Sequence, residues 1–215
     1  RISPGRTFES YYYGAIIAPP TDGGTTHISV IDKDGMAVAL TSTINTGFGS
    51  GIVAAQIGVI LNNEMDDFSA QPGVPNAYGL VGAEANSVEA GKRPLSSMSP
   101  TIVTNEQGKV MMSVGGSGGS HIISSTLQVI LNVLVFEMDA QQAVSAPRFH
   151  HQWQPDMLFV EEDIPADVIR ALEARGHKIK RYDRSIAVQA VVRDEDGLAG
   201  GSDPRKGGWP AGAGR

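Results

Sequence analysis

The chain contains no cysteine, which excludes disulfide bonds and any mechanism that uses a thiolate as nucleophile or metal ligand. Positive charge is also scarce, since 17 Lys and Arg stand against 23 Asp and Glu and the net charge is −6. The longest basic cluster, residues 178–184, is interrupted by Asp183. Because nucleic-acid binding requires a continuous basic face, we predict a solvated surface there and no nucleic-acid partner.

Long apolar runs are absent as well. The longest, residues 122–136, contains several Ser, Thr, Gln and Asn residues, so we predict no membrane segment in this chain. The opening, RISPGRTFES, has no signal-peptide pattern and no Met. We therefore expect the chain to be part of a longer precursor.

The composition is that of a folded domain with many tight turns. Hydrophobic residues make up 41% of the chain and charged residues 19%, which allows a buried core. The 26 glycines predict many sharp changes of backbone direction. A length of 215 residues suits one domain, or one large piece of a bigger one.

The pattern of apolar residues predicts an α+β layered fold. Strand pairs are predicted over residues 26–45, around Asp34-Gly35, and over 101–114 and 185–205. Helices are predicted over residues 121–136, 139–146 and 165–177, the last closed by Gly176 as its C-terminal cap.

Four stretches are predicted to be irregular. Residues 1–24 are rich in Pro and Gly and predict an extended leader, and the tail 206–215 is predicted to be disordered. The run GGSGGS, residues 115–120, is predicted to be a glycine-rich turn before the first helix. Residues 62–100 are rich in Asn, Asp, Gly, Pro and Ser, and so long a loop inside a compact domain is usually a lid or a binding loop.

Thr25, at the start of the first predicted strand, is a candidate nucleophile. A threonine hydroxyl needs a base beside it, and a threonine that begins a chain carries one in its own α-amine. Attack of that hydroxyl on the carbonyl of Gly24 would cut the chain and create the amine. Taken alone, however, two threonines at a strand start are typical of ordinary β-structure.

Seven segments together resemble the small, C-terminal subunit of the γ-glutamyltranspeptidase (glutathione hydrolase) family. In chain order they are TTHISVIDKDGMAVALTSTINTGFGSGI, LNNEMDDFS, PGVPNAYGLVG, KRPLSSMSPTIV, GGSGGSHII, APRFHHQWQPD and SDPR, and they cover nearly all of residues 25–205. The resemblance implies a γ-glutamyltransferase that cleaves the γ-glutamyl amide of glutathione and passes the glutamyl group to water, amino acids or peptides. It implies no cofactor and no metal.

The resemblance also implies an organisation. Residues 1–24 would be the end of a large subunit, and residues 25–215 the small catalytic subunit released by autocleavage between Gly24 and Thr25. The implied fold is an N-terminal-nucleophile hydrolase, a four-layer αββα sandwich of which this chain forms part. The large subunit of the same precursor would be its partner in a heterodimer. Members of the family are usually exported, so we expect the periplasm or the cell exterior.

Catalytic roles are implied residue by residue. Thr25 matches the nucleophile, and Thr43 matches a threonine that hydrogen-bonds it. Gly118 and Gly119 match the glycines whose amides form the oxyanion hole. Tyr78 matches a lid tyrosine that covers the bound glutamyl group.

Substrate-binding roles are implied in the same way. Asn45, Glu64 and Asp67 match residues that hold the α-amino and α-carboxylate groups of the γ-glutamyl moiety, although the family varies between Gln and Glu at the position of Glu64. Ser96 and Ser97 match a serine pair that binds the α-carboxylate. An arginine for the same carboxylate would come from the large subunit.

Two residues depart from the family pattern, and one of them supports a rival mechanism. Ser117 stands where proline is usual, and His121 where arginine is usual. Residues 115–119 also fit G-x-S-x-G, in which Ser117 would be the nucleophile of a serine hydrolase. Asp156 and His177 follow in the order that such an enzyme requires.

Three further alternatives remain open. His150, His151 and Asp156 suggest a metal site, but adjacent strand residues point to opposite faces and disfavour a shared ion. A homologue that is never cut between Gly24 and Thr25 would bind glutamyl compounds without turning them over. A cephalosporin (glutaryl) acylase of the same family would act on substrates without an α-amino group, which the residues that match an ammonium site disfavour.

Overall fold

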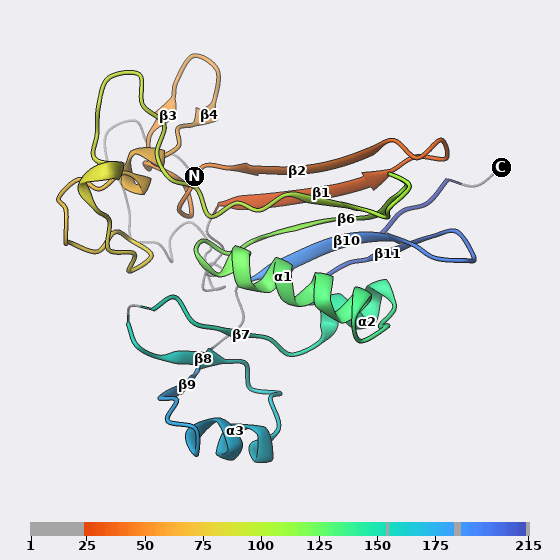
Figure 1. Cartoon of the computed structure of the whole chain (residues 1–215). Helices are drawn as coiled ribbons and strands as arrows, with labels where there is room; N and C mark the ends of the chain where they lie inside the picture. The colour runs from red at the N-terminus through yellow and green to blue at the C-terminus, as the bar shows by residue number, and fades with distance from the viewer. Residues whose placement is uncertain (1–23, 154, 183–185, 214–215) are drawn as a thin grey trace, which may run out of the picture.

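The computed structural model describes residues 24–153, 155–182 and 186–213. The predicted leader, apart from Gly24, therefore lies outside the described residues, as does part of the basic cluster. Three layers are stacked in Figure 1: a β-hairpin, a four-stranded sheet, and a layer of two helices. None of the helices in the described ranges has the length and apolar character needed to cross a membrane.

The hairpin consists of β1 (Thr25–Ile31) and β2 (Ala37–Thr43), which pair antiparallel with Thr25 opposite Thr43. The carboxylate of Asp32 closes the turn by accepting hydrogen bonds from the amides of Asp34 and Met36, at 2.9 and 2.8 Å. The predicted hairpin is confirmed. Alternation along β1 turns Thr25 inward and leaves every second side chain on the outer face.

The central sheet has the strand order β11-β10-β6-β5, and all its pairs are antiparallel. Its members are β5 (Thr101–Thr104), β6 (Val110–Ser117), β10 (Ala187–Arg193) and β11 (Leu198–Gly201). Both predicted strand pairs of this sheet are confirmed. The core lies between β6, β10 and the helices, and includes the fully buried Met112, Val114 and Val188.

β6 continues through Gly115 and Gly116, so the predicted glycine-rich turn begins later than expected. Packing explains the glycines. The ring of His27 lies directly on Gly115, where a Cβ atom would overlap the imidazole. Ser113 and Ser29 also join the layers, since their hydroxyls donate to backbone carbonyls of Val38 and Gln189 at 2.7 and 3.1 Å. The absence of a side chain at position 115 thus allows the hairpin to approach the sheet.

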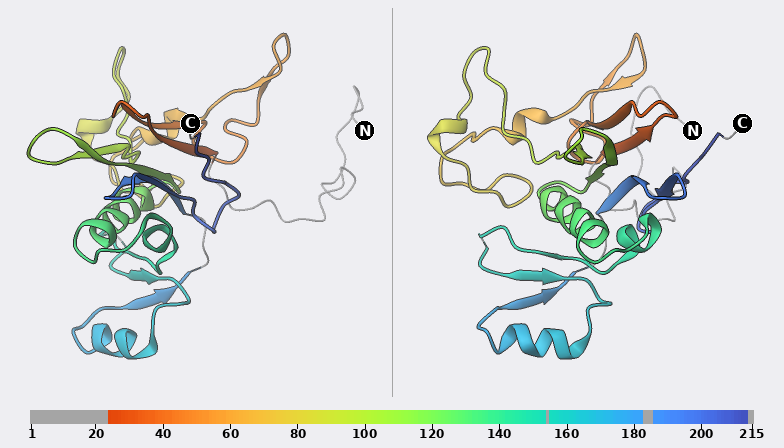
Figure 2. Two further views of the ribbon diagram at one scale, coloured as in Figure 1. Left: turned by 90° about the vertical axis from the view of Figure 1, so that its right-hand side faces the viewer. Right: turned by 45° about the vertical axis from the view of Figure 1, so that its right-hand side comes forward.

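The helical layer consists of α1 (His121–Leu134) and α2 (Ala140–Ser145), close to the predicted ranges. Asp139 and Gln142 form a capping box that fixes the start of α2. Beyond this layer lies a lobe of β7 (Phe149–His150), β8 (Leu158–Val160), α3 (Ala166–Glu173) and β9 (Ile179–Arg181), as Figure 2 shows. Helix α3 was predicted; the three strands, each of two or three residues, were not.

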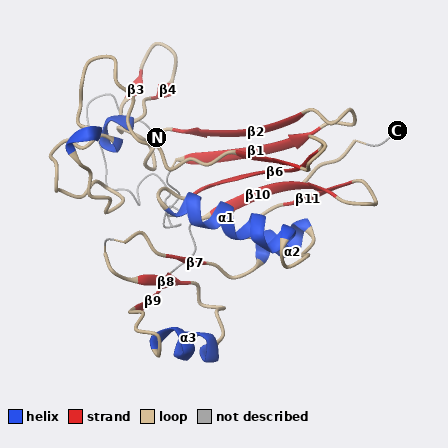
Figure 3. Ribbon diagram, in the orientation of Figure 1, coloured by secondary structure: helices blue, strands red, loops and turns tan. Residues whose placement is uncertain are grey.

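Residues 62–100 are irregular, as predicted, and appear as loops in Figure 3. Their regular structure is limited to the short 3₁₀ helices η2 (Glu64–Asp67) and η3 (Glu84–Asn86) and two isolated bridges. A small unpredicted ribbon, β3 (Val53–Ala54) and β4 (Val59–Ile60), precedes them. These segments gather at the end of the hairpin where β1 begins and β2 ends.

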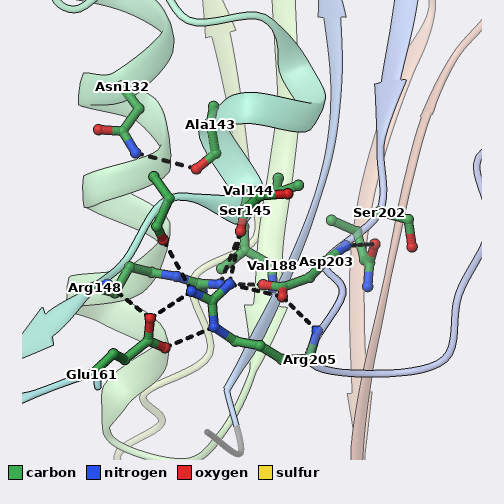
Figure 4. A network of polar contacts seen from close by, with 12 residues as sticks. Asn132, Ala143, Val144, Ser145, Arg148, Glu161, Val188, Ser202, Asp203 and Arg205 are labelled. Atoms are coloured by element: carbon green, nitrogen blue, oxygen red, sulfur yellow. Dashed lines mark hydrogen bonds and ion pairs between the residues drawn. The ribbon is translucent and has the colours of Figure 1, made fainter. Parts of the chain in front are cut away.

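Four charged side chains form a buried network that joins distant parts of the chain (Figure 4). Arg205 donates to Glu161 at 2.7 Å and to Asp203 at 3.0 Å, and the guanidinium of Arg148 pairs with Asp203. All four side chains are 1% exposed or less. Asp203 also accepts from the amide of Val188, at 2.8 Å. The network therefore fastens the segment after β11 to β10, to β8 and to the chain that leaves α2.

We expect Asp203→Asn to lower the free energy of unfolding by about 3–5 kcal/mol, because Arg148 would remain buried without its counter-charge. Urea unfolding at neutral pH measures this. Asp156→Asn is the matched control, since Asp156 pairs with Lys178 at the surface and its side chain is 76% exposed. Equal unfolding midpoints for the two variants would contradict the role given to the network.

Candidate active site

A cavity of about 320 Å³ opens where the hairpin, residues 62–100 and the start of α1 meet. Most of the predicted site residues line it: Thr25, Thr43, Asn45, Glu64, Asp67, Tyr78, Ser96, Ser97 and Gly119. Gly24 and Gly118 adjoin wall residues but are not themselves in the wall. The structure thus brings together side chains from segments that are far apart in the sequence.

Thr25 is the first residue of β1 and is 7% exposed. Its hydroxyl oxygen lies 2.8 Å from that of Thr43, directly across the hairpin. The amide of Asn45 donates to the Thr43 hydroxyl at 2.8 Å. Because that bond uses one lone pair, Thr43 keeps both a proton and a lone pair for Thr25. It can therefore stay bonded to the Thr25 oxygen whether or not that oxygen carries a proton.

Hydrogen bonds hold the carbonyls of the residues on both sides of the peptide bond between Gly24 and Thr25, one from a backbone amide and one from a side chain. The amide of Ile44 donates to the carbonyl of Gly24 at 3.1 Å, and the ammonium of Lys206 donates to the carbonyl of Thr25 at 3.1 Å. Gly24 has φ = +56°, and a Cβ atom there would overlap the carbonyl oxygen of Thr46. This combination of conformation and space requires glycine in the structure as it stands.

Lys206 is a site residue that the sequence analysis missed. The tail that begins with it was predicted to be disordered, but Lys206 bonds to Thr25, so that prediction is wrong at this residue. The preceding Arg205, held in the buried network, explains why the tail begins in a fixed position.

Asn45 follows β2 in a strained conformation, with φ = +72° and 4% exposure. Its side-chain amide donates to the carbonyl of Asn63 at 3.1 Å, which ties it to the segment carrying the acidic residues. Its own carbonyl accepts from the hydroxyl of Tyr78 at 2.9 Å. Asn45 therefore links the end of the hairpin to Asn63, beside the acidic residues, and to Tyr78.

Tyr78 closes one side of the cavity. Its ring lies on Gly119, where a Cβ atom would overlap the ring carbons. Burial, and then the charges of Asp67 and Glu64, raise the pKa of Tyr78 to about 12. The hydroxyl consequently keeps its proton near neutral pH and remains a donor to Asn45.

Glu64 and Asp67 lie together on η2 and line the cavity. Burial, followed by the charge of Asp67 and a hydrogen bond to it, raises the pKa of Glu64 to about 7. Burial also raises the pKa of Asp67. Below about pH 7 the pair therefore holds a proton between its two carboxyl groups. The other oxygen of Glu64, Oε1, is buried and has no hydrogen-bond partner among the described residues, so the pair is suited to a cationic ligand.

The turn from β6 to α1 forms another wall. Gly118 and Gly119 have φ values of +134° and +61°, and Gly118 packs against Ile186. Gly119, Ser120 and Ile122 line the cavity, so the first turn of the 14-residue helix α1 faces it. The positive end of the helix dipole favours an anionic group there.

Ser96 and Ser97 lie in the wall formed by the end of the irregular segment. The hydroxyl of Ser96 accepts from the amide of Met98 at 3.2 Å, which leaves its proton to donate. Two small hydroxyl donors in a wall are suited to a carboxylate.

The residues of the rival mechanisms do not gather in this way. Ser117 is 3% exposed within β6, whereas Asp156 lies at the surface beside Lys178 and His151. His150 is 3% exposed and bonds to Ser124, whereas His151 lies 3.6 Å from the exposed carboxylate of Asp156. Across the described ranges, no group of three or more His, Cys, Asp or Glu side chains could hold a metal ion.

Comparison with known proteins gives the same family from sequence and from structure. A family model described as gamma-glutamyltranspeptidase matches residues 1–213. The glutathione hydrolase proenzyme of Escherichia coli (strain K12) is 52% identical over 190 residues, which are 88% of this chain and 33% of that protein. This chain thus spans about a third of the length of that relative.

Solved structures agree. A mutant of Helicobacter pylori gamma-glutamyltranspeptidase has a TM-score of 0.81 and 50% identity, and the match covers 84% of this chain and 100% of that chain. The cephalosporin acylase of Bacillus halodurans has a TM-score of 0.72 and 28% identity, covering 86% of this chain and 34% of that chain. The predicted family resemblance is confirmed, and the mixed α/β fold is the one these structures share.

The raised pKa of Glu64 predicts a pH-dependent stability. Because its pKa of about 7 exceeds the ordinary value of 4.5, the folded chain binds this proton more tightly than the unfolded chain does. Ionisation of this carboxyl therefore lowers the free energy of unfolding progressively as the pH rises from about 4.5 to about 7. We expect Glu64→Gln to melt at the wild-type temperature at pH 4.5 and at a higher temperature at pH 8.

Thermal denaturation followed by circular dichroism at the two pH values tests this. Glu106→Gln, in the turn between β5 and β6, is the control for loss of a carboxylate at an exposed position. A melting temperature for Glu64→Gln that does not rise relative to wild type between pH 4.5 and pH 8 would show that Glu64 ionises normally.

Proposed function

The chain belongs to the gamma-glutamyltranspeptidase family, and we propose that it is the catalytic part of a glutathione hydrolase whose nucleophile is Thr25. One observation carries the proposal. The Thr25 hydroxyl lies 2.8 Å from Thr43, in the same cavity as a half-buried acidic pair and the amino end of a helix. That cavity offers a nucleophile, a site for an ammonium and donors for an anion.

Activation begins with a cut in the chain. The Thr25 oxygen attacks the carbonyl carbon of Gly24, the C–N bond breaks, and the nitrogen takes the hydroxyl proton. Water then hydrolyses the resulting ester, which leaves a carboxylate on Gly24 and an α-amine on Thr25. The amide of Ile44, 3.1 Å from the Gly24 oxygen, stabilises the negative charge that develops on that oxygen.

Turnover uses the same oxygen. The new α-amine, with an ordinary pKa of about 7.7–8.0, takes the Thr25 hydroxyl proton as the oxygen attacks the γ-carbonyl of the substrate. The amides of Gly118 and Gly119 hold the oxyanion, and one such donor typically contributes about 2.7–4 kcal/mol. The amine returns the proton to the leaving group. Water, or the amine of an amino acid or peptide, then releases the glutamyl group from the ester.

The substrate class follows from the walls of the cavity. Glu64 and Asp67, with Asn45 beside them, bind the α-ammonium of the glutamyl group and lose their shared proton as they do so. Ser96 and Ser97 donate to its α-carboxylate. The binding sites for the two charges thus select an amino acid rather than a simple acyl chain.

The partner is the large subunit from the same precursor. Support comes from length, because this chain matches 33% of the Escherichia coli proenzyme but 100% of a solved chain. The outer face of the hairpin also exposes an apolar strip, each side chain at 46–53%: Ile28, Val30, Val38 and Leu40. We propose that the large subunit covers this strip, extends the hairpin into a second sheet, and completes a four-layer αββα sandwich. Export to the periplasm or the cell exterior belongs to the same proposal.

The Thr25 mechanism predicts that Thr25→Ala and Ser117→Ala differ in both chain cleavage and activity. The whole precursor, which includes residues 1–215 and the large subunit, should give two fragments and release glutamate from glutathione. Thr25→Ala should remain one chain with activity reduced by at least about 10³-fold, because nucleophile and base are both lost. Ser117→Ala should still be cut and active.

Mass spectrometry and a glutamate assay measure both outcomes. A single, inactive wild-type chain would instead support a glutamyl-binding protein that is never cleaved. Loss of activity in Ser117→Ala, with Thr25→Ala still active, would favour the serine hydrolase.

The acidic pair predicts a preference for γ-glutamyl over glutaryl substrates. Glutaryl substrates are those of a cephalosporin acylase. Wild type should prefer a γ-glutamyl anilide to a glutaryl anilide. Asp67→Asn should lower kcat/KM for the first by about 10²-fold, as expected for loss of a hydrogen-bonded charge partner, and change the second little. Asp66→Asn is the control, since the carboxylate of Asp66 accepts from the amide of Ala77 in the loop. A wild-type preference for the glutaryl anilide would reject the proposed substrate.

A further inference from the structure

The side-chain amide of Gln152 lies between the lid and the start of α1. Its Oε1 accepts from the hydroxyl of Ser120 at 2.8 Å and lies 2.9 Å from Nε2 of His150. Its Nε2 donates to the carbonyl of Tyr78 at 3.4 Å. One side chain from the segment after β7 thus contacts two walls of the cavity from behind.

The orientation of this amide follows from its neighbours. A backbone carbonyl can only accept, so the nitrogen of Gln152 must face Tyr78 and its oxygen must face Ser120 and His150. His150 then carries a proton on Nε2, and its Nδ1 lies 2.7 Å from the hydroxyl oxygen of Ser124, which also lies 3.1 Å from the carbonyl oxygen of His121. Burial lowers the pKa of His150, which keeps it in this neutral form. The ring of His121 packs against that of His150, with centroids 3.8 Å apart and planes tilted by 33°.

Ser120 and Tyr78, the two residues that Gln152 contacts in the cavity wall, both adjoin Gly119. Ser120 follows Gly119 in the chain and begins α1, and its side chain makes no capping bond to that helix. Its hydroxyl is used for Gln152 instead. Tyr78 packs on Gly119 from the other side. The lid and the turn that carries the oxyanion amides are therefore joined twice, once through the tyrosine ring and once through Gln152.

We propose that Gln152 is a positioning residue, which holds the Tyr78 segment and the Gly119 turn in register across the cavity. It does not touch the substrate; it acts through Ser120 and Tyr78. Loss of its donor releases the lid and weakens substrate binding, whereas loss of its acceptor frees the turn and slows the chemical step. The kinetic part of this inference rests on the proposed function, while the tether itself does not.

Four single variants of the precursor separate the contact of Gln152 with Tyr78 from its contact with Ser120. Gln152→Met removes both, Gln152→Glu keeps the acceptor and removes the donor to Tyr78, and Ser120→Ala removes the bond to the turn. Gln128→Met is the matched control, because Gln128 also joins α1 to β7 by bonds to Ser124 and Phe149 but lies outside the cavity wall.

With a γ-glutamyl anilide, we expect Gln152→Glu to raise KM about 3- to 10-fold with little change in kcat, as for one lost hydrogen bond. Ser120→Ala should lower kcat by a similar factor with little change in KM. Gln152→Met should do both, and Gln128→Met neither. Equal kinetics for Gln152→Met and Gln128→Met in an active enzyme would overturn the proposal.

Limited proteolysis tests the tether without any substrate. Residues 70–82 should be cut faster in Gln152→Met and Gln152→Glu than in wild type or Gln128→Met, because the lid has lost an anchor. Equal cutting rates would reject the tether even if the protein proves to be no glutathione hydrolase. An inactive wild type with faster cutting in the two Gln152 variants would reject the proposed function and leave the tether standing.

Discussion

The arrangement of the site depends on one backbone register, the antiparallel pairing that sets Thr25 opposite Thr43. A slip of one residue would turn the Thr25 side chain to the outer face of the hairpin and separate the two hydroxyls. Packing of His27 stabilises this register, because its ring lies directly against the backbone of Gly115 in the central sheet. The chemistry at one end of the hairpin is therefore a consequence of how closely two layers approach.

Much of the fold could be predicted because its signals are local. Alternating apolar residues around Asp34-Gly35 specify the hairpin, and Asp139 with Gln142 specifies the start of α2. Glycines in β6 misled the prediction, because the close approach of His27 to Gly115 comes from a residue far away in the sequence. The strands of the outer lobe are too short for a periodic pattern to be visible.

The candidate site divides in the same way. The family resemblance supplied the residue types that line the cavity, but the shared proton of Glu64 and Asp67 depends on burial that only the folded chain creates. Gln152 and Lys206 carry no local signal of their roles, since each acts on a segment distant in sequence. APRFHHQWQPD and SDPR contain three of the four charged residues of the buried network, Arg148, Asp203 and Arg205, yet nothing in either segment alone shows that they meet.

The buried network has a consequence for the order in which the fold is completed. Asp203 and Arg205 are translated long after Thr25, and Lys206, which holds the Thr25 carbonyl, follows them directly. A nascent chain still on the ribosome before residue 206 emerges lacks both the ion pair of Arg148 with Asp203 and the hydrogen bond of Lys206 to Thr25. The start of β1 therefore reaches its final packing only after residues 203–206 have left the ribosome.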